Sequence, residues 1–329
     1  TAPPAERVEL KHGAMSKTVT MSSREALKQK KTAVLMGGLS AEREISLKTG
    51  NAVLKALLEN GCDAVAVDVG HDLAVQLRQA QAEQAFICLH GRFGEDGTVQ
   101  GLLEMMRIPY TGSGVMSSSV AMDKVVSKQI MLYHQIPTPG FIAYRAGEDR
   151  AALLERSRHF PLIVKPAREG STIGITVADD RRRLEEGLDL ALELDELVLI
   201  EDFIKGDEVT VSVLNGQPLP IIKIVPKSGF YDYRSKYTPG QTEYILPAPL
   251  DAELYTRLQE TSVAACRALS CRGAARVDFM IREQEFFCLE VNTIPGMTET
   301  SLLPKAAAEA GLSFHELAMQ ILEDAGLFK

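Results

Sequence analysis

Two short stretches near the end of the chain carry the side chains best suited to chemistry, Arg276-Val277-Asp278 and Glu290-Val291-Asn292. Side chains alternate across a strand, so Arg276 shares a face with Asp278, and Glu290 shares one with Asn292. If the two strands pair, three oxygen ligands gather beside an arginine. Such ligands, without His or Cys, suit magnesium, which commonly bridges ATP phosphates. The alternative is a merely solvated strand face, which the otherwise apolar surroundings of Glu290 disfavour.

A lysine that precedes a glycine-containing loop is the second candidate. Lys165 ends the apolar run PLIVK, and the loop 166–174 contains Gly170 and Gly174. Such a loop lets backbone N–H groups approach phosphate oxygens, while the lysine supplies a point charge. The spacing is not that of a Walker A loop, because GxxxxGK[ST] is absent. The alternative is an ordinary hairpin turn with a surface lysine.

The end of the next strand resembles an edge that reads adenine. It runs from Glu201 through Phe203 to Ile204, and Glu208 follows. Backbone groups there could read the purine, and a carboxylate could take the ribose hydroxyls. A plain linker between two lobes fits this short stretch equally well.

Two loops near the N-terminus follow apolar runs. Gly37-Gly38 permits a sharp turn into a helix start, which favours anionic groups, but GxGxxG is absent and a dinucleotide-dependent oxidoreductase is disfavoured. Glu42 either holds a substrate ammonium or compensates the helix dipole. His90 opens a glycine-rich loop at a strand end, where doubly wound sheets bind ligands. A later polar loop, 226–241, contains Lys236 and Tyr237 and is either a lid or a surface excursion.

The elements that must position these residues divide into two kinds. Short apolar runs alternate with helical patterns over residues 33–106, which predicts a parallel sheet covered by helices. The C-terminal two-thirds mixes hairpin signals with amphipathic helices. Strands at 208–214 and 219–225 are joined by Asn215-Gly216, a strong hairpin signal. The sequence therefore predicts an α/β fold, α+β in its C-terminal two-thirds, with three lobes.

Breaks in this pattern define the expected domains. Residues 1–30 are polar and without apolar periodicity, so we expect a disordered segment or one added by cloning. An N-terminal α/β domain follows, then a central subdomain, then a C-terminal subdomain that contains the loop 226–241. Their expected bounds are 31–112, 113–201 and 202–329.

The composition limits the classes of function. The chain has 329 residues, 45% of them hydrophobic, and a net charge of −8, which argues against a nucleic-acid binder. No stretch approaches the roughly 20 apolar residues that cross a bilayer. The five cysteines are odd in number and have no CxxC spacing, so we expect neither disulfides nor zinc, and a reducing, cytoplasmic setting.

Taken together, the motifs resemble the ATP-grasp superfamily and, within it, the D-alanine–D-alanine ligase family. The resemblance runs from about residue 32 to the C-terminus, and it rests on seven segments that occur in the family's order. These are MGGLSAEREISL, LHGRFGEDGTVQG, YTGSGVMSSSVAMDK, VKPAREGSTIG, FYDYRSKY, RVDFM and LEVNTIPGMTETSLLP. The implied fold is the three-lobed ATP-grasp architecture, with a parallel-sheet domain preceding the grasp.

The resemblance implies a nucleotide site and a metal site. Residues implied to contact ATP are Lys124, Lys165, Glu201, Phe203, Ile204, Glu208 and Lys236. Asp278, Glu290 and Asn292 are implied to hold two magnesium ions, with manganese as a substitute. The implied partners are ATP, D-alanine and a second copy of the chain in a homodimer.

The resemblance also implies sites for two D-alanine molecules and for the oxyanion. The set that fixes the first D-alanine and locks the lid is Glu42, Ser171 and Tyr237. Arg276 and the backbone N–H of Gly296 would stabilise the oxyanion. The carboxylate of the second D-alanine would meet Ser301 and Leu302, close to His90. Two other readings stay open: a ligase that makes the D-alanyl–D-lactate ester, which Tyr237 disfavours, and a catalytically silent nucleotide-binding protein.

Overall fold

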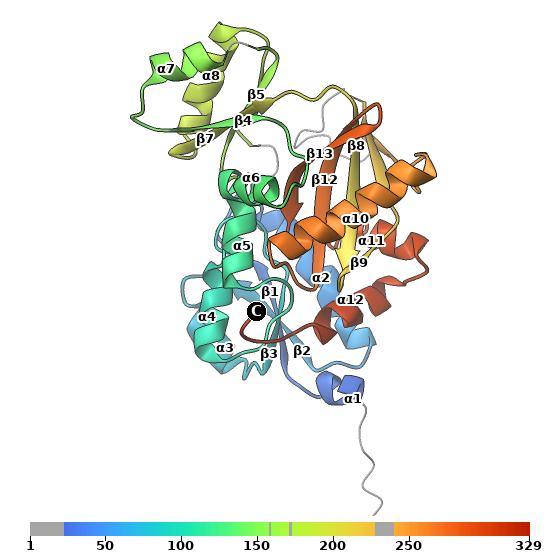
Figure 1. Cartoon of the computed structure of the whole chain (residues 1–329). Helices are drawn as coiled ribbons and strands as arrows, with labels where there is room; N and C mark the ends of the chain where they lie inside the picture. Colours follow the sequence, from blue (N-terminus) through green and yellow to red (C-terminus); the bar gives the residue numbers. More distant parts are fainter. Residues whose placement is uncertain (1–22, 158, 171–172, 228–239) are drawn as a thin grey trace, which may run out of the picture.

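The computed structural model describes residues 23–157, 159–170, 173–227 and 240–329. Three sheets form its framework, and helices pack on each of them (Figure 1). The predicted class, α/β with α+β in the C-terminal two-thirds, is confirmed. None of the helices in these four ranges is long and apolar enough to cross a membrane.

The N-terminal sheet is parallel, in the order β2-β1-β3. Its strands are β1 (Thr32–Gly37), β2 (Ala64–Val69) and β3 (Gln84–Ile87), and its helices are α2 (Arg43–Glu59), α3 (Leu73–Gln79) and α4 (Thr98–Met106). Strand β1 is buried throughout because both of its faces are covered. Val34 and Met36 pack with α2, whereas Ala33 and Leu35 pack with α3 and α4. This two-sided burial explains the unbroken apolar run in the sequence.

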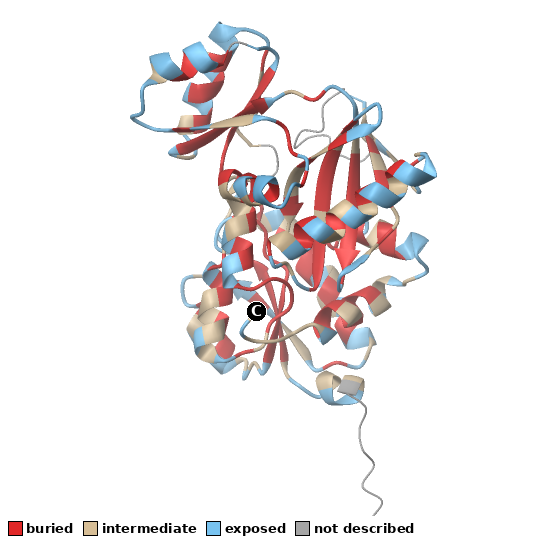
Figure 2. Cartoon of the chain, viewed as in Figure 1, coloured by how far each residue is buried: buried red, intermediate tan, exposed pale blue. Residues whose placement is uncertain are grey.

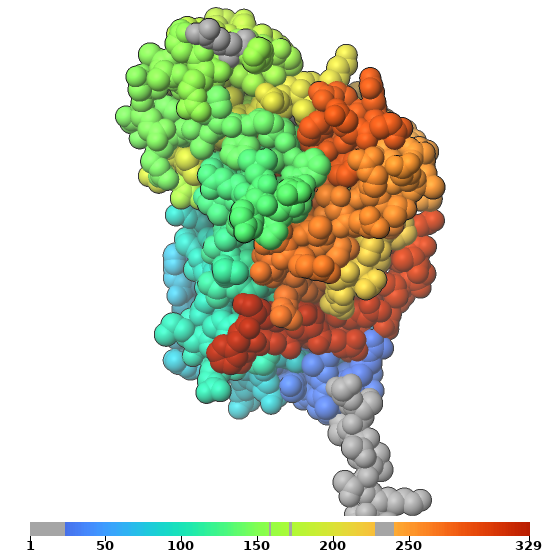
Figure 3. Space-filling view, viewed as in Figure 1, coloured from blue at the N-terminus to red at the C-terminus, as the bar shows by residue number. Residues whose placement is uncertain are grey.

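The central lobe contains an antiparallel sheet of four strands, in the order β4-β7-β5-β6. The strands are β4 (Phe141–Arg145), β5 (Leu162–Pro166), β6 (Thr176–Ala178) and β7 (Leu197–Asp202). Two helices, α7 (Arg150–Arg156) and α8 (Arg181–Leu192), belong to the same lobe. In the space-filling view this lobe, green to yellow-green, projects at the top of the molecule (Figure 3). Strands β5 and β6, on either side of the glycine loop, pair antiparallel.

The third sheet forms the body of the C-terminal part and is antiparallel, in the order β11-β10-β8-β12-β13. Its strands are β8 (Asp207–Leu214), β9 (Gln217–Pro218), β10 (Ile222–Pro226), β11 (Thr242–Ile245), β12 (Ala274–Arg282) and β13 (Glu285–Asn292). Helix α10 (Ala252–Ala268) crosses it, and the buried strands lie behind this helix in Figure 2. The strand expected at 219–225 begins only at Ile222. Pro218 and Pro220 explain the break, because proline cannot donate to a ladder.

Helices α5 (Val115–Met122) and α6 (Lys124–Tyr133) connect the N-terminal domain to the central lobe. Asp123 begins α6, and its carboxylate accepts hydrogen bonds from the N–H groups of Val125 and Val126, both at 3.0 Å. This N-cap fixes Lys124 at the first position of the helix.

The first and last parts of the chain share one core. Side chains of α2 pack with those of α11 (Leu302–Glu309) and α12 (Phe314–Glu323). Gly50 of α2 lies so close to Met36 that an added Cβ would come within 2.4 Å of that side chain. The N-terminal domain therefore packs directly against the C-terminal helices. The domain boundaries at 112 and 201 stay a prediction.

Part of the segment expected to lie outside the fold is helical. Helix α1 covers Ser23–Lys28, so the expectation of a disordered segment was wrong for these residues. Arg24 donates to Glu316 at 2.7 Å and also pairs with Glu323, and both partners lie on α12. These contacts hold a helix too short to be stable alone. Residues 1–22 lie outside the described ranges.

Candidate active site

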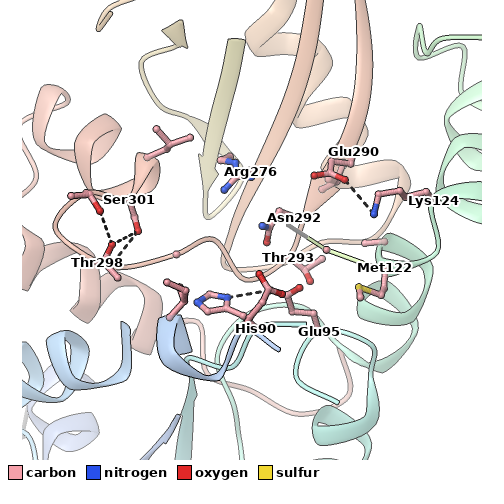
Figure 4. Close-up of a pocket in the computed structure, with 18 of the residues that line it drawn as sticks. His90, Glu95, Met122, Lys124, Arg276, Glu290, Asn292, Thr293, Thr298 and Ser301 are labelled. Carbon is pink, nitrogen blue, oxygen red and sulfur yellow. Dashed lines mark hydrogen bonds and ion pairs between the residues drawn. The ribbon is translucent and has the colours of Figure 1, made fainter. Parts of the chain in front are cut away.

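The hairpin of β12 and β13 brings the four predicted residues together. Arg276 lies opposite Asn292 and Asp278 lies opposite Glu290, so the expected pairing is confirmed. Directly opposed residues on one face have side chains in contact range. In Figure 4, Arg276, Glu290 and Asn292 project from this hairpin toward the same cavity. The two strands therefore present these side chains on one common surface, as their alternation predicts.

Internal ion pairs already balance the charges on this surface. The Arg276 guanidinium donates to both oxygens of Asp278, at 2.9 and 2.8 Å. Thr210 on β8 donates to Asp278 at 2.5 Å, and Lys124 reaches Glu290 at 3.4 Å. Each carboxylate on this surface therefore has a neighbouring cation. A charged ligand could draw that cation away from the carboxylate.

The donor chemistry of this group fits a hard divalent cation. Asp278 and Glu290 offer carboxylate oxygens, and Asn292 offers an amide oxygen, which accepts from the N–H of Ile294 at 3.0 Å and keeps a second lone pair. Across the described ranges, no group of three or more His, Cys, Asp or Glu is placed to hold a metal. The set has only two carboxylates, so a metal here would depend on further oxygens, which phosphates supply.

A second charged cluster lies under the loop of the central lobe. Glu201 at the end of β7 is 3% exposed and forms ion pairs with Lys165 and, at 2.9 Å, with Lys128. Lys128 is completely buried and also donates to Thr138 Oγ1 at 2.5 Å. At the predicted strand end, the Glu201 carboxylate therefore faces two lysines.

The environment of this cluster shifts two pKa values. Burial alone would raise the pKa of Glu201, but the charges of Lys128 and Lys165 outweigh it, and the net shift is downward. Burial lowers the pKa of Lys128, and the charge of Glu201 opposes that shift. Glu201 is thus held ionised although water hardly reaches it.

The glycine loop approaches the N-terminal domain at Glu42. An added Cβ at Gly170 would come within 3.2 Å of Glu42 Oε2, and one at Gly91 within 2.8 Å. Only glycine's lack of a side chain lets two loops close around this carboxylate. Lys124 binds the same loop through the backbone oxygen of Glu169, at 2.7 Å.

His90 is held at both ring nitrogens. Its Nε2 lies 3.3 Å from Thr49 Oγ1, and its Nδ1 lies 3.3 Å from Glu95 Oε1. Burial raises the pKa of Glu95, and the hydrogen bond to His90 opposes the rise. The ring is therefore oriented from two sides at the wall of the cavity that Figure 4 shows.

The start of helix α11 forms the opposite wall. Ser301 Oγ accepts from the N–H of Thr298 at 3.0 Å and lies 2.8 Å from Thr298 Oγ1. Ser301 is the N-cap residue and Leu302 is the first residue of the helix. A helix start of this kind presents N–H groups to anions. Gly296 lies beside it, where a Cβ would come within 2.8 Å of Ser301 Oγ.

These walls enclose two cavities that meet. The smaller, about 130 Å³, is lined by residues that include Glu42, His90, Arg276, Asn292, Gly296, Ser301 and Leu302. The larger, about 720 Å³, is lined by residues that include Lys165, Glu201, Phe203, Ile204, Glu208 and Asp278. Lys124, Gly170 and Glu290 line both. A ligand in one cavity can therefore react with a ligand in the other at these three residues.

Some site residues lie outside the described ranges, and others were missed. Ser171, Lys236 and Tyr237 belong to the first group. Lys128, Glu95 and Thr210 were not among the predicted residues. Lys128 lies one helical turn after Lys124, and that spacing was the available signal. Glu95 belongs to the glycine-rich loop of His90, whereas nothing in the sequence marked Thr210.

Family profiles and full-length relatives both match this chain. The profile "D-ala D-ala ligase C-terminus" matches residues 130–323, and "D-ala D-ala ligase N-terminus" matches residues 71–113. The D-alanine–D-alanine ligase of Syntrophotalea carbinolica is 61% identical over 306 residues, which cover 93% of this chain and 99% of that protein. That of Citrifermentans bemidjiense is 50% identical over 304 residues, 92% of this chain and 98% of its own length.

Solved structures show the same arrangement. The D-alanine–D-alanine ligase from Bacillus anthracis, complexed with ATP, has a TM-score of 0.80 and 39% identity, covering 90% of this chain and 96% of its own. The VanG D-Ala:D-Ser ligase from Enterococcus faecalis has a TM-score of 0.77 and 31% identity, covering 89% and 98%.

The parallel-sheet domain, the two antiparallel sheets and the cavities between them define an ATP-grasp protein. Two grasping sheets, β4–β7 and β8–β13, contribute facing walls to the larger cavity. Within that class, the chain belongs to the D-alanine–D-alanine ligase family.

Proposed function

We propose that the chain joins two D-alanine molecules into D-alanyl-D-alanine at the expense of ATP, supplying peptidoglycan precursor synthesis. The single observation that carries the mechanism is the junction of the two cavities at Lys124, Gly170 and Glu290. The larger cavity lies in the range of about 300–1,000 Å³ typical of ligand sites, which suits a nucleotide. The smaller one suits a pair of small zwitterions.

The nucleotide lies in the larger cavity. The backbone that follows β7, at Phe203 and Ile204, contacts the adenine, and the Glu208 carboxylate accepts hydrogen bonds from the ribose hydroxyls. Lys165 and Lys124 lie toward the phosphates, where a lysine acts as a point charge. Glu201 holds Lys165 in place through their buried ion pair. Lys236, in the loop 226–241, reaches phosphate when that loop covers the site.

Asp278, Glu290 and Asn292 would hold two magnesium ions, for which manganese can substitute. When bound, these ions neutralise charge on the β- and γ-phosphates and orient them for transfer. The chain's own contribution is the placement of three oxygen ligands on one hairpin face, next to Lys124 and Arg276.

The first D-alanine is activated at the junction. Its ammonium pairs with Glu42, which is 8% exposed, and Ser171 and Tyr237 complete the set that positions it. Its carboxylate attacks the γ-phosphorus, the bond to the β-phosphate oxygen breaks, and ADP leaves. Positioning and charge neutralisation by Lys124 and Lys165 carry this step, because a phosphoryl group in transfer spreads negative charge over its oxygens.

The second D-alanine then attacks the acyl phosphate. Its carboxylate binds at the start of α11, at Ser301 and Leu302, with His90 nearby. Its neutral amine attacks the carbonyl carbon, and Arg276 and the N–H of Gly296 stabilise the oxyanion. Phosphate leaves and the amide remains. The loop 226–241 excludes water, which would otherwise hydrolyse the acyl phosphate.

The proposal is tested by incubating the protein with ATP, magnesium and D-alanine and measuring phosphate release and product mass together. We expect release that depends on D-alanine and on a divalent ion, with D-alanyl-D-alanine as product. The same assay with D-alanine and D-lactate at neutral pH distinguishes an ester-forming ligase. Preferential ester formation, or no D-alanine-dependent release, contradicts the proposal.

We further propose that the protein works as a cytoplasmic homodimer. All five cysteines are free thiols, as a reducing compartment favours. Helices α4, α5 and α6 carry large exposed apolar side chains, as interfaces between subunits do. These are Met105, Met116, Leu132 and Tyr133. Sedimentation equilibrium of the wild type against Leu132→Lys tests the dimer, and a wild-type monomer at micromolar concentration contradicts it.

A further inference from the structure

The C-terminal end of helix α10 has a backbone geometry that brings two side chains together. The N–H of Cys271 donates to the carbonyl of Cys266 at 2.8 Å, and the N–H of Ser270 donates to that of Arg267 at 3.0 Å. Ser270 adopts a left-handed conformation with φ of 57°. These three features define a Schellman motif, in which the first and last residues of the hydrogen-bonded turn commonly touch through their side chains.

Both positions that touch in this motif are cysteines here. Cys271 packs against the hydrophobic cluster that contains Cys266, and both residues line one cavity. In a typical Schellman motif the contact between these positions is simply apolar. In this chain the same geometry creates a pair of neighbouring thiols, only five residues apart and outside the ligase site.

The two cysteines differ in how far they are exposed. Cys271 is partly exposed, whereas Cys266 is buried and 6% exposed. Cys271 lines a surface cavity of about 590 Å³, together with Arg267 and Arg272. A second cavity, of about 190 Å³, is lined by both cysteines, so the two residues border the same space.

The surroundings make Cys271 the more reactive thiol. Its hydrogen bond with Cys266 lowers the pKa of Cys271; burial opposes that effect, and hydrogen bonds from Ser117 and Ser113 add to the lowering. Ser117 Oγ lies 3.6 Å from the Cys271 sulfur. The same contact with Cys271, followed by burial, raises the pKa of Cys266. A lowered pKa and an open approach are the features of a thiol that reacts first.

The surface around Cys271 also favours an anionic reagent. Glu323 and Asp324 also line the surface cavity at Cys271, but each already forms an ion pair, Glu323 with Arg24 and Asp324 with Lys329. Arg267 and Arg272 thus contribute positive charge at the mouth. A small anionic disulfide, such as oxidised glutathione, fits both the opening and the charge.

We propose that Cys266 and Cys271 form a dithiol site that is oxidised to an intramolecular disulfide by small anionic disulfides. The Cys271 thiolate attacks one sulfur of the reagent, which forms a mixed disulfide and expels one glutathione thiolate. The Cys266 thiol then loses its proton and attacks the sulfur of Cys271, expelling the second glutathione. Two protein thiols and one glutathione disulfide become one protein disulfide and two glutathione thiols, so atoms and electrons balance.

Trypsin gives a direct readout, because Arg267 lies between the two cysteines. Cleavage yields the peptides Leu258–Arg267 and Ala268–Arg272, each with one cysteine. The folded full chain is treated with oxidised glutathione, alkylated, digested without reductant and analysed by mass spectrometry. We expect the two peptides to be linked, with the loss of two hydrogen atoms, before Cys62, Cys88 or Cys288 react. Dithiothreitol restores the separate peptides.

Single variants separate this site from ordinary thiol reactivity. In Cys266→Ser we expect glutathione to remain on Cys271, since no second thiol displaces it. In Cys271→Ser we expect Cys266 to stay free because it is buried. Cys62→Ser, which removes a buried thiol next to Met319, leaves the linked pair unchanged. The proposal is overturned if the wild type keeps a stable glutathione adduct at Cys271, or if both thiols stay free while the protein is folded.

Discussion

Two charged clusters border the larger cavity, and they differ in how far water reaches them. Lys128, Glu201 and Lys165 have side chains that are 0%, 3% and 8% exposed. In the pair of Lys124 and Glu290, the carboxylate is 31% exposed and the contact is longer, 3.4 Å against 2.9 Å for Lys128 and Glu201. The buried cluster shapes the wall, whereas the partly exposed Glu290 can exchange Lys124 for the groups of a ligand.

Similar charges therefore have different roles in the two clusters. Breaking a buried ion pair leaves an uncompensated charge in a poorly hydrated place, so the free energy of unfolding falls. Breaking a pair whose carboxylate is partly exposed costs less stability, because water and ions can replace the partner. We therefore expect changes in the first cluster to alter folding and changes in the second to alter catalysis.

The largest effect is expected for Glu290→Gln. The amide keeps the shape of the side chain but removes the charge at the junction of the two cavities, so turnover should fall by about 10³-fold or more. The measurement is D-alanine-dependent phosphate release, with thermal unfolding recorded in parallel.

Glu285→Gln is the matched control for that change. Glu285 lies on the same strand, is exposed, and pairs with Arg282 at 2.8 Å. We expect it to keep near-wild-type turnover. Near-normal phosphate release by Glu290→Gln would refute the role given to that carboxylate.

The next effect is expected for Lys128→Met, which removes one cation from the buried cluster. Glu201 keeps only Lys165, and the free energy of unfolding should fall by about 3–5 kcal/mol. Urea denaturation at pH 7 measures the change. Lys55→Met is the control, because Lys55 is exposed and its contact with Glu59 is 3.9 Å, so we expect a change below about 0.5 kcal/mol. Equal effects of the two variants would contradict the distinction between the clusters.

The same cluster should make stability depend on pH. The pKa of Glu201 is lowered in the folded protein, so its stabilisation is present above its ordinary value of 4.5 and is lost as pH falls through the lowered folded value. Lys128→Met removes the largest opposing charge. The stability gap between wild type and this variant should therefore narrow below about pH 4.5. A gap that widens on acidification would show that Glu201 is not held ionised by Lys128.

The smallest effect is expected at two helix caps with the same geometry. Asp123 caps α6 and Asp149 caps α7, each through one carboxylate oxygen and two backbone N–H groups. Replacing either with alanine should cost about 1 kcal/mol. Only Asp123→Ala should also raise KM for ATP, since Lys124 follows it. Equal KM values in the two variants would show that the cap does not position Lys124.

Local patterns predicted the catalytic hairpin well. Arg276 and Asp278 are separated by one apolar residue, and so are Glu290 and Asn292. The sequence therefore identifies the polar face of each strand. Periodicity of this kind depends only on neighbours in the chain, and the sequence shows it directly. The register that places Asp278 opposite Glu290 depends on an irregularity between Asp278 and Phe279, which the sequence did not show.

Features made by distant packing were not predictable in the same way. Lys128 looks like any helical lysine until α6 packs against the end of β7 and buries it. Helix α1 forms because Arg24 meets Glu316 and Glu323, which lie about 300 residues later. Neither contact leaves a periodic signal, and both depend on the completed fold.

The central claim is that a carboxylate from the smaller cavity receives a phosphoryl group from the larger one. Isotope transfer tests it most directly. With D-alanine labelled by ¹⁸O in its carboxylate, the account predicts that each released phosphate carries one ¹⁸O atom, because the acyl phosphate breaks between carbon and the labelled oxygen. Phosphate released without label during dipeptide formation would contradict the account.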